Sequence, residues 1–441
     1  MTTAPSVWRK DVLAWSLYDL ANTIYSMNIV SLYLKRYIVQ DLGQPDHYFD
    51  IAFSLSMALT ALVLPALGAM SDHTTKKKLF LLLFTLTCCI SVGLLAAVPS
   101  SMVFLLLILF VIANFSYEAG MPFYNALLYS VADGTQARFV SGIGVAIGYI
   151  GSIVGMLLVL PFVSGSIMNL SVPFIDGSGK SGAFLPTAVL FLIFAIPTFI
   201  WVREKRTHVP ERTSIRQAYR EVWEGIRNTR RFPGVLRYLI ADYFFEDAVA
   251  TVILNIGLYC SVVLQLPENQ ISMFLILSTI SAVIGSFIVG KIAQHWSLKH
   301  LLSIIMWGWV VSLVMFALTD NTTVTWILGS VVGILLGGLW TTSRPLLAEL
   351  VPREDLGRFF GLFALSGRAA AIFGPLVWAA VVFFAQPGTP VGRWFGKHLA
   401  LDSVTATQLP YKLAVLSLAG MIAIGLLIFR KVPHTRSVPN E

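Results

Sequence analysis

Charged residues are scarce in this chain. Lys, Arg, Asp and Glu together make up 12% of its 441 residues, about half the share of roughly a quarter that is usual in globular proteins. Hydrophobic residues make up 56%, and the mean hydropathy is +0.76. A water-soluble protein of this composition would lack the polar surface that keeps it in solution. The composition therefore excludes a soluble enzyme or nucleic-acid-binding protein and favours an integral membrane protein.

Cysteine and histidine are also sparse. Three cysteines, Cys88, Cys89 and Cys260, stand in apolar runs and form neither a disulfide framework nor a zinc motif. The seven histidines lie in loops, at the ends of apolar runs or in the tail. The chain has no His-Glu-x-x-His string, no phosphate-binding glycine loop with lysine, and no nucleophile–base string. We therefore expect no metal, no cofactor, and neither enzymatic nor ATP-driven chemistry.

Long apolar runs are abundant. A helix that spans a bilayer needs roughly 20 apolar residues. Twelve stretches meet this requirement, and they are 12–38, 49–71, 79–99, 101–131, 139–164, 183–202, 234–263, 268–290, 300–319, 322–350, 359–386 and 411–430. The first contains Asp19 and Asn22 and is too long for a signal peptide, so we interpret it as a span.

The distribution of Lys and Arg predicts the orientation of these spans. With the N-terminus in the cytoplasm, the inner segments hold 23 basic residues and the outer segments hold 6. Cytoplasmic loops of membrane proteins carry such an excess. Both termini are therefore expected in the cytoplasm. The same distribution accounts for the net charge of +8. The partner that it implies is the lipid bilayer, and it gives no reason to expect nucleic acid as a partner.

A long inner connection divides the spans six and six. We expect an N-terminal half over 1–202, a cytoplasmic linker over 203–233 and a C-terminal half over 234–441. Residues 213–231 have the pattern of an amphipathic helix with a basic face, which would lie on the inner leaflet. A solvated linker helix and a calmodulin-like target site are alternative interpretations.

The two halves contain matching strings. Gly68–His73 matches Gly290–His295 at an offset of 222 residues, and Asp19 matches Asp242 at an offset of 223. A third pair, NALL followed by ARF and RPLL followed by GRF, has an offset of 220. The predicted fold is thus an all-α membrane protein with twelve transmembrane helices in two pseudo-symmetric six-helix halves. This architecture resembles that of the major facilitator transporters, which bind substrate between their halves and alternate access by rocking.

The loop after the second span resembles the major facilitator signature. It contains Gly68, then Asp72, then the basic pair Lys76 and Lys77, with Thr75 where the signature has glycine. We interpret it as a cytoplasmic gate, in which Gly68 permits close helix contact and Asp72 pairs with a cation or a helix dipole. The second-half copy has Gln294 instead of an acid. A plain positive-inside loop is the alternative.

More specific strings resemble the vacuolar-effluxer, autophagy-related branch of that superfamily and its bacterial relatives over the whole chain. They are Trp15-Ser-Leu-Tyr18-Asp19-Leu-Ala-Asn22, Phe123-Tyr124-Asn125, Gly337-Gly338-Leu-Trp340-Thr-Thr-Ser343-Arg344 and Gly367-Arg368. The yeast vacuolar members are associated with amino-acid efflux, which the resemblance makes an expectation here. Trp340 replaces a usual Gln, and Glu246-Asp247-Ala248 replaces an expected Asn-Asp-Gly, so the substrate can differ.

Seven charged residues lie inside the predicted spans and away from their ends: Asp19, Glu118, Asp242, Glu246, Asp247, Arg344 and Arg368. Each costs on the order of 3 kcal/mol at the bilayer centre unless it is paired or faces water. In one interpretation the arginines are buried structural partners of the acids. In the other, Arg368 and Arg344 bind substrate, while Asp19, Glu118, Asp242, Glu246 and Asp247 are the proton-coupling candidates, Glu118 or Asp247 foremost.

Neutral polar residues complete the predicted substrate site. Asn22, Tyr25, Asn125 and Tyr149 are our cavity candidates, with Trp340 as a stacking partner or plug, although each is also typical of a helix–helix contact. Glu118 is a candidate ligand for an ammonium group. The pairs Gly144–Gly148 and Gly151–Gly155 have the small-xxx-small spacing of closely packed helices.

The sequence thus predicts a monomeric secondary transporter in a bacterial cytoplasmic membrane. Its partners would be a small-molecule substrate, foremost a zwitterionic amino acid or related metabolite, and protons. Efflux of an amphiphilic drug-like or siderophore-like compound is one alternative. A lipid scramblase or a non-transporting membrane sensor is an alternative from another class.

Overall fold

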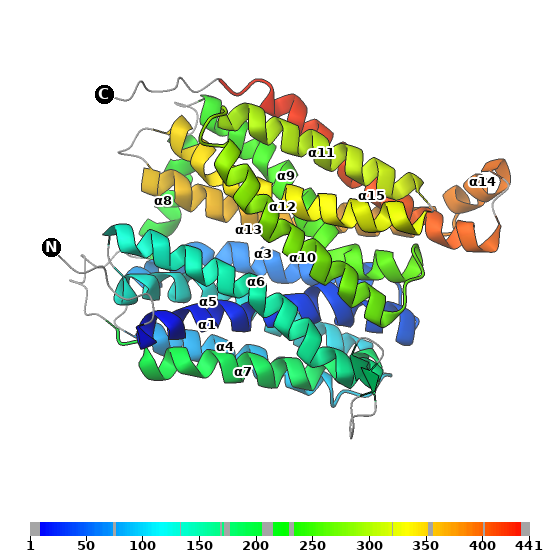
Figure 1. The fold of residues 1–441 in the computed structure, drawn as a ribbon, viewed down its shortest axis with the longest axis horizontal. Coiled ribbons are helices and arrows are strands. Elements are labelled where there is room, and N and C mark those ends of the chain that lie inside the picture. The colour runs from blue at the N-terminus through cyan, green and yellow to red at the C-terminus, as the bar shows by residue number, and fades with distance from the viewer. Residues whose placement is uncertain are drawn as a thin grey trace. The chain divides into compact units, whose positions relative to one another are not determined.

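The computed structural model describes residues 9–73, 76–132, 134–167, 170–171, 177–204, 215–228, 233–319, 321–351, 356–399 and 402–433. The chain divides into two compact units (Figure 1). The first comprises Met1–Tyr219 and Glu268–Ser272, and the second comprises Arg220–Pro267 and Met273–Glu441. Both are built almost entirely of helices.

The first unit opens with a helical segment in four parts, α1 (Lys10–Tyr25), the π-helix η1 (Ser26–Tyr33), α2 (Leu34–Arg36) and the π-helix η2 (Tyr37–Asp41). The remaining elements are α3 (His47–His73), α4 (Lys77–Leu95), α5 (Val103–Val131), α6 (Gly134–Ser164), the short antiparallel strands β1 (Ser166–Ile167) and β2 (Leu170–Ser171), the 3-10 helix η3 (Lys180–Ala183) and α7 (Phe184–Trp201).

The second unit contains α9 (Pro233–Val262), α10 (Glu268–Ile292), α11 (Leu298–Leu318), α12 (Thr322–Leu350), α13 (Leu356–Ala385), α14 (Pro390–Leu399) and α15 (Ser403–Phe429). The first turn of α10 is the exception, because Glu268–Ser272 groups with the first unit. The predicted amphipathic helix is present as α8 (Ile215–Asn228), which contains the division between the units. Tyr219 of α8 donates a hydrogen bond to the Leu62 carbonyl at 2.7 Å.

In the described residues, ten helices are long and apolar enough to cross a membrane. They correspond to ten of the twelve predicted spans. The stretch 12–38 is divided by η1, and 234–263 is α9, which carries Asp242, Glu246 and Asp247. Large apolar side chains such as Phe104 and Phe287 are exposed on these helices, as expected of surfaces that face lipid.

Glycines allow α6 to approach α1 closely. A Cβ at Gly144 would lie 2.6 Å from an Asp19 carboxylate oxygen, and one at Gly151 would lie 2.6 Å from the Leu20 backbone. A larger residue at Gly151 would require the backbone to move, and one at Gly144 would displace the Asp19 and Trp15 side chains. The predicted packing role is therefore confirmed for these two glycines.

The second unit repeats this arrangement between α13 and α9. A Cβ at Gly367 would lie 2.6 Å from a Glu246 carboxylate oxygen, and one at Gly374 would lie 2.6 Å from Asp247 Oδ1. Gly367 and Gly374 follow Gly144 and Gly151 by 223 residues, the offset that relates Asp19 to Asp242. The internal repeat therefore extends to the glycines of this helix contact, although the acid at Gly367 is Glu246, one turn beyond the counterpart of Asp19.

We predict that Gly151→Ala destabilises the first unit, by roughly 1–3 kcal/mol as for other overpacked contacts. The added methyl would collide with the backbone of Leu20. Thermal unfolding in detergent would measure the loss. Gly420→Ala is the matched control, because a Cβ there meets no atom within 4 Å. Equal melting temperatures for the two variants would contradict the packing role.

Candidate functional site

The polar residues of α1 in the first unit are held by α5. Tyr25 is fully buried, and its hydroxyl donates to Asn114 Oδ1 at 3.4 Å. Asn114 in turn donates to Ser56 Oγ of α3 at 2.7 Å. Buried Asn22 lies 3.4 Å from the Met121 sulfur. In this conformation the structure places Asn22 and Tyr25 in helix–helix contacts.

Asp19 lies beside an aromatic stack. The Trp15 and Tyr124 rings are parallel with centroids 4.7 Å apart, and Tyr18 stacks on Tyr124 at 4.9 Å. Trp15 Nε1 donates to the Tyr124 carbonyl, and the Tyr124 hydroxyl donates to the Trp15 carbonyl, both at 3.2 Å. Tyr124 also interacts electrostatically with Asp19. The stack thus fixes α1 on α5 and holds the carboxylate between α5 and Gly144.

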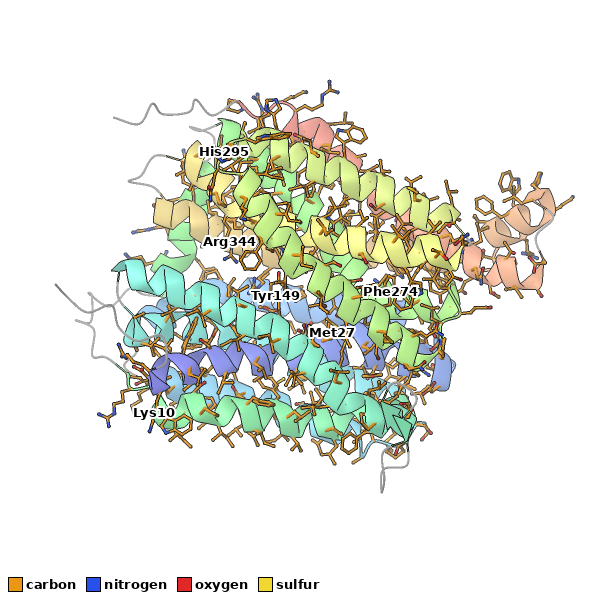
Figure 2. The ribbon with its side chains drawn as sticks, viewed as in Figure 1. Lys10, Met27, Tyr149, Phe274, His295 and Arg344 are labelled. Carbon is orange, nitrogen blue, oxygen red and sulfur yellow. The ribbon has the colours of Figure 1, made fainter. Side chains whose placement is uncertain are left out.

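The other candidates of the first unit are more open. Asn125 on α5 is exposed, and Tyr149 on α6 is half-buried (Figure 2). Glu118 on α5 is half-buried and interacts electrostatically with Tyr25. The structure therefore brings Glu118 and Tyr25 together within this unit.

Asp242 is fully buried on α9 in the second unit. The Tyr238 hydroxyl lies 3.3 Å from Asp242 Oδ1 and 2.7 Å from the Ser343 carbonyl of α12. A hydroxyl carries one hydrogen, so the Tyr238 hydroxyl donates mainly to the nearer acceptor, the Ser343 carbonyl, and only weakly to Asp242. Asp242 Oδ2 has no hydrogen-bond partner among the described residues. This carboxyl group is therefore incompletely stabilised as an anion and suited to hold a proton.

Glu246 stands one turn further along α9 and interacts electrostatically with two cations. Its carboxylate contacts the backbone at Gly367, and the guanidinium groups of Arg368 and Arg344 both attract it. Arg368 is half-buried on α13, whereas Arg344 is exposed on α12 (Figure 2). The structure thus brings together three of the predicted site residues. Trp340, on α12, is 45% exposed.

Asp247 points toward α13 and is fully buried. Its Oδ1 accepts a hydrogen bond from the Gly374 backbone N–H at 2.7 Å. Its Oδ2 has no hydrogen-bond partner among the residues that are described. One strong donor with one bare oxygen is an arrangement that accommodates either the anion or the acid.

The predicted cytoplasmic gate is described in part. An added Cβ at Gly68 would meet no atom within 4 Å, so the close helix contact expected there is absent among the described residues. Thr75 and the Asp72 side chain lie outside the described residues. Lys76 is exposed and Lys77 is half-buried at the start of α4. The neighbouring Lys78 connects α4 to the end of α7, because its Nζ donates to the Val202 carbonyl at 2.7 Å.

A buried ionic triad was not predicted from the sequence. Lys35 Nζ lies 2.7 Å from Asp46 Oδ1 and 2.7 and 2.8 Å from the two carboxylate oxygens of Asp50. All three side chains are at most 2% exposed. Lys35 is one of the six basic residues that the charge count places in the outer segments, and no periodicity indicates that it turns inward.

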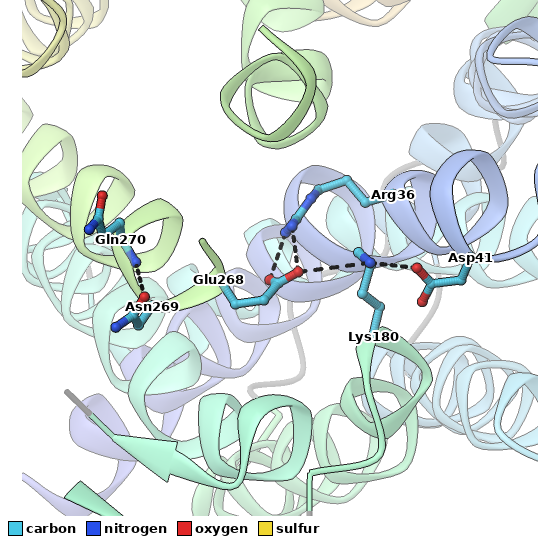
Figure 3. Close-up of polar contacts among 6 residues, drawn as sticks. All are labelled: Arg36, Asp41, Lys180, Glu268, Asn269 and Gln270. Atoms are coloured by element: carbon cyan, nitrogen blue, oxygen red, sulfur yellow. Dashed lines mark hydrogen bonds and ion pairs between the residues drawn. The ribbon is translucent and has the colours of Figure 1, made fainter. Parts of the chain in front are cut away.

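A second ionic cluster is built around Arg36, the residue that follows Lys35 (Figure 3). Arg36 makes a bidentate pair with Glu268, with N–O distances of 2.9 and 2.5 Å. Lys180 lies 2.5 Å from Asp41 and 3.9 Å from Glu268. Bidentate arginine–carboxylate pairs are among the strongest and most directional ion pairs. This cluster fixes the first turn of α10, Glu268–Ser272, against α2 and η3.

The second unit also contains a polar cavity of about 320 Å³, distant in sequence from the α9 acids. Gln265, Thr322, Thr405, Gln408 and Lys412 are among its lining residues. In the described part of the chain, no three His, Cys, Asp or Glu side chains gather closely enough to hold a metal ion.

We predict that Lys35→Met destabilises the protein by about 3–5 kcal/mol, the usual effect of leaving a buried charge without its partner. Asp46→Asn should have a smaller effect, because Lys35 and Asp50 remain as a one-to-one pair. Thermal unfolding in detergent measures both. Lys291→Met, at an exposed lysine, is the control, and a Lys35→Met melting temperature equal to that of the control would contradict the assignment.

The sequence is similar to known transporters. The model of the vacuole effluxer Atg22-like family matches residues 44–136 and 128–382. An uncharacterised MFS-type transporter of Bacillus subtilis (strain 168), YxiO, is 26% identical over 371 residues, which cover 82% of this chain and 86% of YxiO. Autophagy-related protein 22 of Coccidioides immitis (strain RS) is 22% identical, over 75% of this chain and 66% of that protein.

The fold is similar to that of a solved transporter. A bacterial homologue of the human lysosomal transporter Spinster, in an inward-facing and occupied conformation, matches with a TM-score of 0.73 at 14% identity. The match covers 97% of this chain and 98% of the other. At this identity the match shows the fold alone, which is the predicted major facilitator fold. Together with the family match over most of the sequence, it establishes that the chain belongs to the vacuole effluxer Atg22-like family of MFS-type transporters and is not an enzyme.

Proposed function

We propose that this MFS-type transporter moves a small zwitterionic solute, an amino acid or a related metabolite, in exchange for or together with protons. The six-helix halves over 1–202 and 234–441, joined by the linker 203–233, would rock to alternate access to a site between them. The protein would act as a monomer in a bacterial cytoplasmic membrane with both termini inside. Gly68, Asp72, Lys76 and Lys77 would form its cytoplasmic gate.

The observation that carries the proposal is the acidic segment of α9. Asp242 and Asp247 are buried, and each keeps one oxygen without a hydrogen-bond partner among the described residues. A buried carboxylate without sufficient donors binds a proton readily, because neutralisation removes the desolvation penalty. In a structural ion pair we would expect both oxygens to be satisfied. This arrangement supports proton binding and release on α9.

Glu246 supplies a physical link between substrate and proton. The positive charges of Arg368 and Arg344 both attract the Glu246 carboxylate. A substrate carboxylate would compete with Glu246 for these cations. Once displaced, Glu246 would be a buried acid without compensation and would take up a proton. Glu118 in the first unit is the candidate for the substrate ammonium, with Asn22, Tyr25, Asn125 and Tyr149 as further ligands in another conformation.

Efflux of an amphiphilic compound is the second candidate. It is favoured by Trp340, which keeps 45% of its surface exposed on the same helix as Arg344. An indole in this position can stack on an apolar or aromatic group of a substrate.

We predict that Asp247→Asn abolishes accumulation driven by a proton gradient while solute exchange across the membrane without a gradient persists. Glu118→Gln should also abolish the gradient-driven accumulation, and it should weaken exchange as well, because Glu118 is the proposed ligand of the substrate ammonium. Either substitution removes a proton-binding group and keeps the shape of the side chain. Uptake of a labelled amino-acid mixture into proteoliposomes, with and without an imposed gradient, measures both activities. Gradient-driven accumulation that survives the double substitution would overturn the role of both acids.

Asp402→Asn is the matched control for charge. Asp402 caps α15 and accepts hydrogen bonds from Thr405, which lower the pKa of its carboxyl group. It is therefore ionised at neutral pH, and asparagine keeps the capping function. Its replacement should leave accumulation unchanged. A loss equal to that of Asp247→Asn would indicate a general charge effect instead of proton coupling.

We predict that Arg368→Lys raises the substrate KM at least tenfold, because lysine cannot make the bidentate contact to a carboxylate that arginine makes. The same variant should still move an amino-acid amide, which keeps the ammonium group but lacks the carboxylate, as well as the parent protein does. Uptake of the acid and the amide, measured in parallel, tests this. If amino acids are not accumulated by the parent protein, the substrate assignment fails, and amphiphilic compounds are tested next.

A further inference from the structure

The connection between α13 and α15 contains a short helix, α14 (Pro390–Leu399), in the second unit. Thr389 starts it: its hydroxyl accepts the Gly392 N–H at 3.0 Å, and its carbonyl accepts the Arg393 N–H at 2.9 Å. In Figure 1 the helix stands beyond the ends of α11 and α12 of the same unit. It therefore lies at the end of the bundle where α15 begins.

Helical spacing divides α14 into two faces. Val391, Trp394, Phe395 and Leu399 occupy positions i, i+3, i+4 and i+8 of the helix, so they form one apolar stripe. Arg393 and Lys397 lie one turn apart on the opposite side. The helix contains no acidic residue.

Much of the apolar stripe is left exposed, although Phe395 is half-buried. Val391, Trp394 and Leu399 are 45%, 55% and 54% exposed. Trp394 makes its close ring contact with His398 of its own helix, at a centroid distance of 4.5 Å. Three large apolar groups left outside the core on so short a helix indicate that another apolar medium covers them.

Position and charge identify that medium. The helix is tied by short connections to α13 and α15, both candidate spans, so it is held near the level at which hydrocarbon gives way to headgroups. Tryptophan beside basic residues is the composition of membrane interfaces. The helix carries two basic side chains and no carboxylate. Its charge therefore complements an anionic lipid surface and would be repelled by a positively charged one.

We propose that α14 is an interfacial anchor, with Trp394 and its apolar neighbours in the acyl boundary of the leaflet at this end of the protein and with Arg393 and Lys397 on anionic phospholipid headgroups. The anchor holds the α13–α15 connection against the bilayer while the spans on either side move. This assignment does not depend on the identity of the transported solute.

Site-specific fluorescence tests the proposal in the full chain. Val391→Cys places a polarity-sensitive fluorophore on the apolar stripe, and Gly396→Cys places it off the stripe, where an added Cβ meets no atom within 4 Å. The native cysteines are buried, so the labelled parent protein gives the background. The variants are reconstituted in phosphatidylcholine vesicles with and without phosphatidylglycerol, and each sample is made with and without phospholipids that carry a quencher in the acyl chain.

The fluorophore at position 391 should be quenched strongly and emit at shorter wavelength, and the one at 396 should be quenched less. Phosphatidylglycerol should increase the quenching at 391. Arg393→Gln with Lys397→Gln should remove that increase, since each basic residue near an anionic surface changes local partitioning by a factor of about five. Equal, weak quenching at both positions would overturn the proposal. Protection at 391 that disappears on dilution of protein in the membrane, with lipid composition unchanged, would overturn it in favour of a second copy of the chain.

Discussion

The price of placing a charge in hydrocarbon governs the arrangement of this transporter. Each intramembrane ion must find donors, a counter-ion or water within the protein. Lys35 forms ion pairs with two aspartates, and Asp247 accepts a hydrogen bond from the Gly374 N–H. Glu246 interacts electrostatically with two arginines. A proton or a charged substrate can bind at such a group only where this compensation is incomplete. The cost of burying charge therefore determines both how the helices are arranged and which of the charged groups can function in transport.

The glycine contacts are what bring the acids to these positions. Asp19 lies against Gly144 in the first unit, and Glu246 lies against Gly367 in the second. The two glycines correspond, whereas Glu246 stands one turn beyond Asp242, the counterpart of Asp19. The absence of a side chain on the glycine leaves space for a carboxylate within the helix interface. In both units a duplicated packing rule therefore places an acid at the contact of the first helix with the fifth. The two copies have since acquired different neighbours, because the arginines stand in the second unit.

Much of this architecture follows from the sequence, since apolar run length and the internal offset predict the helices, and small-residue spacing predicts the α1–α6 contact. The neighbours of particular side chains do not follow. Tyr25 was expected to face a cavity, but its hydroxyl donates a hydrogen bond to Asn114. Helical periodicity indicates the direction in which a side chain points, but it does not indicate which helix packs against that side chain. Lys35 and α14 were both assigned to outer segments, where a count of charges cannot distinguish a buried triad or an amphipathic turn from a solvated loop.

The π-helix η1 changes the angular register of everything that follows it. Its hydrogen bonds join residues five apart, whereas those of an α-helix join residues four apart. The residues after Ser26–Tyr33 therefore point in other directions than they would on a continuous α-helix. Lys35 and Arg36 follow this segment closely, so the faces on which they lie depend on it. Deleting one residue within η1 would turn the two cations toward a different face, which makes the length of this segment a determinant of ionic pairing that no single substitution can reproduce.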